Sequence, residues 1–166
     1  MPERIPAAAT MDGVLRAKKR DIEAGRAVPT HLLIIGNEQP VTVPLPRLTD
    51  AKAREAFLAE QGRLYAGVRP QAVLLVGVEA NSNLTLFEGH HSLVVAFLDY
   101  GGYSRGVVQP YVVADGKVCW LQEDVTTNAQ LATERNELAA FFRGVKEAQS
   151  SARAAPRRTP AWRFRR

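Results

Sequence analysis

The residues best suited to chemistry lie near the C-terminal end of the sequence. Residues 150–166, called the basic tail below, contain six arginines and no aspartate or glutamate. Guanidinium groups bind phosphate, and guanidinium and aromatic planes stack on nucleobases. The tail therefore predicts contact with an anionic partner (nucleic acid, an acidic protein surface or anionic lipid) or with a neighbouring subunit, although a merely solubilising segment has a similar composition. The candidate binding residues are Arg157, Arg158, Trp162, Arg163, Phe164, Arg165 and Arg166.

The positive charge of the chain resides in this tail. The 166 residues carry 22 lysines and arginines against 17 aspartates and glutamates, a net charge of +5. Without the six tail arginines, 16 basic and 17 acidic residues remain. The sequence therefore predicts one nearly neutral globular domain over residues 1–149 and a separate tail over 150–166.

A glycine-rich stretch offers a second candidate surface. Residues 101–106 read Gly-Gly-Tyr-Ser-Arg-Gly, without the lysine and the strand-to-helix context of a phosphate-binding loop. A flexible hairpin connection is the favoured interpretation. Its side chains Tyr100, Tyr103 and Arg105 would add an exposed stacking surface to the tail.

Histidine and carboxylate side chains are densest at residues 88–91, Glu-Gly-His-His. Imidazoles and carboxylates are the groups of acid–base catalysis and of metal sites. Adjacent histidines on a strand point to opposite faces, so His90 and His91 make a poor chelating pair. A polar loop entering a strand is the favoured interpretation, and we expect no metal site.

Acidic residues at strand ends suggest an alternative, a metal-dependent hydrolase or nuclease at the sheet edge. Such enzymes require two or three carboxylates to converge on one ion, here Glu79, Asp99 and Glu123. The same residues are common on ordinary surfaces. The lone Cys119 is interpreted as a small buried hydrophobe, and no serine nucleophile motif is present. Catalytic residues therefore stay unassigned, and a non-enzymatic protein without a cofactor is expected.

The elements that must position these residues follow from hydrophobic periodicity and turn residues. Residues 72–76 and 93–98 are apolar on both strand faces and predict central strands with both faces covered. Asp115-Gly116 is a hairpin turn signal. Thr127 and Gln130 have capping-box spacing and predict the start of the last helix. The expected elements are helices at about 10–25, 50–69 and 127–149, and strands at 31–35, 41–45, 72–76, 93–98, 107–113 and 117–121.

This order, α-β-β-α-β-β-β-β-α, does not alternate as a doubly wound fold does. We predict an α+β fold with a mixed or mostly antiparallel sheet of five to six strands and about three helices. Three helices leave part of such a sheet open, so a homo-oligomer that buries an apolar face is a further expectation.

Location is predicted from what the sequence lacks. Residues 1–10 have no charged-then-apolar signal pattern, and no apolar run approaches the length of a membrane span. A single cysteine cannot form an intrachain disulfide. These features favour a cytoplasmic protein with no membrane span.

Overall fold

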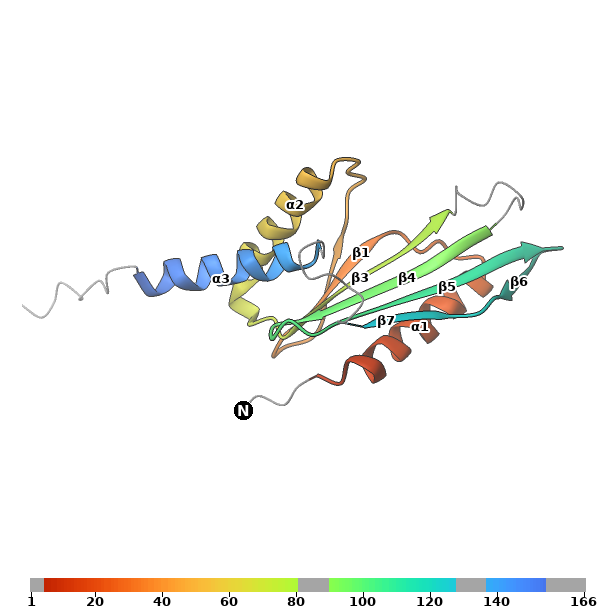
Figure 1. The fold of residues 1–166 in the computed structure, drawn as a ribbon, viewed down its shortest axis with the longest axis horizontal. Helices are drawn as coiled ribbons and strands as arrows, with labels where there is room; N and C mark the ends of the chain where they lie inside the picture. The colour runs from red at the N-terminus through yellow and green to blue at the C-terminus, as the bar shows by residue number, and fades with distance from the viewer. Residues whose placement is uncertain (1–4, 81–89, 128–136, 155–166) are drawn as a thin grey trace, which may run out of the picture.

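The computed structural model of the chain describes residues 5–80, 90–127 and 137–154. Within them a seven-stranded antiparallel sheet is packed against three helices, as Figure 1 shows. The helices are α1 (Ala7–Glu23), α2 (Ala51–Leu64) and α3 (Ala139–Ala154). The strands are β1 (His31–Ile35), β2 (Val41–Pro44), β3 (Ala72–Ala80), β4 (His90–Asp99), β5 (Ser104–Ala114), β6 (Lys117–Trp120) and β7 (Asp124–Thr127). The predicted α+β class and element order are confirmed, and β7 is a strand beyond those predicted.

Neighbouring strands follow the order β2-β1-β3-β4-β5-β6, with β7 also paired to β5. The centre of the sheet is the long β3–β4–β5 meander, in which Val76 pairs with Val95 and Val95 with Val107. Asp115 and Gly116 both have positive φ, 52° and 73°, and form the tight turn between β5 and β6. The hairpin predicted from this dipeptide is confirmed.

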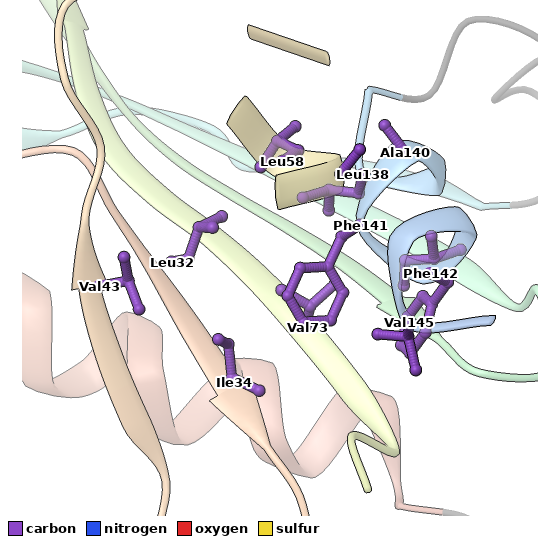
Figure 2. Close-up of a cluster of buried hydrophobic side chains, with 12 residues drawn as sticks. Leu32, Ile34, Val43, Leu58, Val73, Leu138, Ala140, Phe141, Phe142 and Val145 are labelled. Carbon is purple, nitrogen blue, oxygen red and sulfur yellow. The ribbon is translucent and has the colours of Figure 1, made fainter. Parts of the chain in front are cut away.

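The two faces of the sheet carry separate hydrophobic clusters. On one face, Met11 and Leu15 of α1 pack on alternate residues of β3 and β4, including the fully buried Phe97. On the opposite face, α2 and α3 cover Leu32, Ile34 and Val73. Figure 2 shows the ring of Phe141, a residue of α3, next to Val73 in this cluster. Both faces of the central strands are therefore covered by helices, as their two-sided apolar pattern predicts.

The α2–α3 pair packs through glycine. A Cβ atom added at Gly62 would overlap the backbone carbonyl of Phe141, and one added at Gly144 would overlap the carbonyl of Ala59. Only glycine lets the two backbones approach this closely. This contact fixes α3 against α2 and so sets where the exposed side of α3 faces.

The outer edge of β5 is shared by two short strands. Strand β6 pairs with residues 111–114 of β5 and β7 with residues 105–108. Pro110 lies at the junction, where its carbonyl accepts a hydrogen bond from the Leu121 backbone N–H at 2.9 Å. Because a residue in an antiparallel strand directs its N–H and C=O to the same edge, the missing N–H of Pro110 falls on the side of Leu121. The Leu121 carbonyl accepts a hydrogen bond from the Gln109 side-chain amide instead, at 2.6 Å. Strand β5 therefore runs unbroken through Pro110.

Two predicted boundaries are corrected around the last helix. Thr127 does not cap the helix, because it is the last residue of β7 and its backbone pairs with Arg105 of β5. The β-branched run Val125-Thr126-Thr127 favours this strand. The predicted partner in the capping box, Gln130, lies outside the described residues. Helix α3 continues to Ala154, four residues past Ser150, where the predicted tail begins. Ser, Ala and Arg all tolerate a helix, and the first proline beyond Ser150 is Pro156.

Candidate functional site

The tail residues predicted to bind a partner, Arg157 to Arg166, lie outside the described residues. The only described tail arginine is Arg153, which is exposed near the end of α3. In Figure 1 the C-terminal half of α3 extends beyond the end of the sheet. The basic tail therefore continues from a helix whose last turns project from the domain.

The structure separates the three loop residues predicted to join the tail. Tyr100 lies on the side of α3, with its ring edge-on to Phe142 at 5.7 Å between centroids. Tyr103 packs instead against Phe97, in the cluster on the α1 face. Arg105 pairs with Phe97 in the β4–β5 ladder and so faces the same side as that residue. Of the three, only Tyr100 shares a surface with the helix that leads to the tail.

A cleft lies beside Tyr100, between the β4–β5 turn and α3. Its volume is about 710 Å³, within the usual range for small-ligand sites. Leu98 and Phe142 supply apolar wall, and Arg143 and Lys146 bring cationic groups from α3. Apolar walls with a few converging polar groups are typical of a binding site.

The cationic groups of α3 form a stripe along one side of the helix. Arg143, Lys146 and Arg153 are three and seven residues apart, spacings that place side chains on the same side of a helix. All three are exposed, and Arg143 forms no ion pair with any residue that the structure describes. The one acid on this part of the helix, Glu147, is 2.9 Å from Arg63 of α2, which offsets its charge. We call Arg143, Lys146 and Arg153 the cationic stripe.

Sequence reasoning missed Arg143 and Lys146. Their signal was present, because the predicted last helix has a polar side on which these two residues precede Arg153 at helical spacing. The sequence did not show which element that polar side would face. The structure supplies this information by placing the β4–β5 turn and its Tyr100 beside it.

The histidines do not form a site among the described residues. His91 stacks on Tyr111 of β5, with ring centroids 5.4 Å apart, on the α1 face. His90 is its neighbour on the strand and faces the opposite side. His31 is in β1, where its Nδ1 lies 2.8 Å from the carbonyl of Pro29.

The acids considered for a metal site are also apart. Asp99 pairs with Ala72 at one end of the β3–β4 ladder, whereas Glu79 pairs with Ser92 near the other end. Seven residues of strand separate these positions, about 23 Å. Glu123 directly precedes β7, whose Asp124 pairs with Val108 in the middle of β5. No group of three His, Cys, Asp or Glu side chains suited to a metal ion occurs in the described part of the chain.

A second cleft, of about 690 Å³, lies beside β2 and the start of α2. Two of its four charged lining residues bind each other: Arg54 donates to both carboxylate oxygens of Glu137 at 2.9–3.2 Å and to the carbonyl of Leu48 at 3.0 Å. The other two, Arg47 and Glu79, have opposite charges. These bonds to Glu137 raise the pKa of Arg54 above its ordinary value. Because Arg54 and Glu137 satisfy each other, this cleft offers less to a charged ligand than the cleft beside Tyr100.

A polar and aromatic cluster joins α1 to the end of the sheet. Lys19 donates to the buried Gln109 at 3.0 Å, and the Gln109 amide donates to the Leu121 carbonyl at 2.6 Å. The Trp120 indole N–H donates to Glu23 at 2.8 Å. Each of these polar groups has a partner within the protein, so the cluster is structural. Cys119, on the short strand β6, is exposed and not buried as the sequence had suggested.

Burial in this cluster predicts a pH effect on stability. Tyr111 is only 6% exposed, and desolvation raises the pKa of its phenol above the ordinary value of 10.0. Above about pH 10 the unfolded chain ionises this group before the folded chain does, so the free energy of unfolding should fall by up to about 1.4 kcal/mol per pH unit from this residue. Urea unfolding of the full chain and of Tyr111→Phe, at pH values on both sides of 10, measures the difference. An identical pH slope in the two proteins would contradict the prediction.

No helix in the described ranges is long and apolar enough to cross a membrane. Comparison with protein-family models, with curated proteins and with solved structures found no match to this chain.

Proposed function

We propose that this chain is a non-enzymatic binding module for single-stranded nucleic acid. The observation that carries the proposal is the cationic stripe of α3, which borders a cleft with a half-exposed tyrosine and leads directly into the basic tail. Residues 143–166, which hold stripe and tail, carry eight cationic residues and one acid, whereas the rest of the chain has 14 basic and 16 acidic residues. Proteins that bind single strands combine a cationic track for the backbone with aromatic side chains that stack on bases.

The sign of the charge argues against the tail folding back on its own cleft. The tail carries six arginines and no acid, and the cleft presents two exposed cations, Arg143 and Lys146. Of the two acids in its lining, Glu147 is paired with Arg63 and Asp99 is buried. Like charges repel each other, whereas an anionic strand would be attracted to both surfaces. A strand is also long enough to contact the cleft and the tail together, which a single small anion is not.

The test measures the binding of the full chain to a labelled single-stranded oligonucleotide by fluorescence anisotropy. The measurement is repeated at a series of salt concentrations. The test variant replaces Arg163, Arg165 and Arg166 with glutamine and keeps Trp162 and Phe164. The control variant replaces three exposed cations away from the stripe, Arg47, Lys52 and Lys117, with glutamine.

The tail variant should bind more weakly, with the slope of log K against log salt smaller by about 2, because three phosphate contacts are lost. The control variant should keep most of the original slope. Equal slopes for the full chain and the tail variant would overturn the proposal. Sedimentation of the same proteins would then test the remaining partner of the tail, a neighbouring subunit.

A further inference from the structure

We infer that the cleft beside Tyr100 receives one base of the single strand, stacked against the Tyr100 ring, with the adjoining phosphate bound by Arg143 and Lys146. This inference rests on the proposed function and assigns a specific role to the cleft. The cleft would therefore distinguish a strand with bases from a bare sugar-phosphate chain.

The Tyr100 ring is held in place before any ligand arrives. Its backbone N–H donates to the Gln71 carbonyl at 2.9 Å, and its hydroxyl donates to the Gln149 side chain at 3.4 Å. The ring of Phe142 meets it at an interplanar angle of 88°. Despite these contacts Tyr100 remains 43% exposed. An exposed ring with fixed orientation loses little conformational freedom when a base stacks on it.

Lys146 occupies the position that a ligand would take. Its ammonium group lies 5.1 Å from the centre of the Tyr100 ring, a cation–π contact that is weak at an exposed site. Base stacking on an aromatic side chain is generally the stronger interaction. When a nucleotide binds, its base would replace the ammonium group on the Tyr100 ring. The Lys146 ammonium group would then bind the adjoining phosphate.

The local charges suit a phosphate at this point. Arg143 and Lys146 line the cleft, and the nearby Glu147 is bound to Arg63. The other acid of the cleft, Asp99, directs one carboxylate oxygen to the backbone N–H of Tyr103 at 2.8 Å. Glu147 is thus paired with a cation, whereas Asp99 keeps its negative charge, so the two cations of the cleft exceed its unpaired acid by one charge.

The experiment compares two strands that differ only in their bases. The probes are a labelled oligothymidylate of about twelve nucleotides, within the site sizes of small single-strand modules, and an abasic strand of equal length. The proteins are the full chain, Tyr100→Ala, Tyr100→Phe and Lys146→Gln, all with the tail intact, so any stacking by Trp162 and Phe164 is common to all four. Circular dichroism establishes that each variant is folded.

The full chain should bind oligothymidylate about fivefold or more tightly than the abasic strand. Tyr100→Ala should lower this ratio at least threefold without changing the affinity for the abasic strand, and Tyr100→Phe should keep it. Lys146→Gln should weaken binding of both strands equally. A ratio in Tyr100→Ala equal to that of the full chain would overturn the inference.

Other outcomes separate this inference from the proposed function. If the full chain binds both strands equally, the base site is wrong while the nucleic-acid module stands. If it binds neither strand, the proposed function fails and the inference with it. Thymidine monophosphate should compete only weakly, and affinity equal to that of the strand would overturn the assignment to a single strand in favour of a free nucleotide.

Discussion

Gly144→Ala should lower the free energy of unfolding by about 3 kcal/mol or more, because the added methyl group overlaps the backbone of the neighbouring helix. The obstructing atom is the carbonyl oxygen of Ala59, with its Cα and carbonyl carbon close behind. Backbone atoms cannot rotate away as a side chain can, so α2 and α3 must separate. Separation would open the cluster around Phe141, the α3 side chain that lies next to Val73 in Figure 2.

A matched control for this variant is Gly13→Ala. Gly13 is also inside a helix, but it is exposed and a Cβ atom there would contact nothing within 4 Å. Alanine should therefore stabilise α1, by about 0.5–1 kcal/mol. Urea unfolding followed by circular dichroism measures both variants. The close helix contact would be refuted if Gly144→Ala were as stable as the original chain.

Phe97→Ala should destabilise the domain by about 3–5 kcal/mol, the usual range for a large aromatic side chain deleted from a core. Phe97 is fully buried on the α1 face of β4, where its ring meets that of Tyr103 at 6.5 Å between centroids. The deletion leaves a cavity beneath α1, which the rigid central strands cannot fill by collapse.

The control here is Phe97→Leu, which keeps most of the volume and should cost less than about 1.5 kcal/mol. The double variant with Gly144→Ala gives a second measurement. Phe97 and Gly144 belong to clusters on opposite faces of the sheet, so their effects should add within about 0.5 kcal/mol. Unfolding midpoints that are the same for Phe97→Ala and Phe97→Leu would show that this side chain does not hold α1.

Local signals predicted most of the fold. Two-sided apolar runs marked β3 and β4, and the Asp115-Gly116 pair marked the turn between β5 and β6. These features depend on residues close in sequence, which explains why they could be predicted from the sequence alone. Strand β7 was missed because it has only four residues, and its pairing partner, Arg105–Val108, is almost twenty positions away.

The candidate site was predicted only in part, for a similar reason. The tail could be recognised by composition, and Tyr100 as an exposed aromatic near glycines. The joining of Tyr100 with Arg143 and Lys146 depends on the β4–β5 turn lying beside α3, which is a contact across more than forty residues. The division of Tyr100 from Tyr103 depends on which way each ring leaves the turn, which composition does not specify.

The two short strands on the outer edge of β5 have a consequence for aggregation. A strand of eleven residues with an open edge would be a template on which another chain could add its own strand. Here the edge is divided between β6 and β7, each of four residues, and residues 121–123 connect them opposite Pro110 of β5. At the opposite border of the sheet, β2 is equally short and ends in Pro44. In the described part of the chain neither border offers a long row of unpaired backbone groups, so the sheet is protected from growing sideways into a fibre.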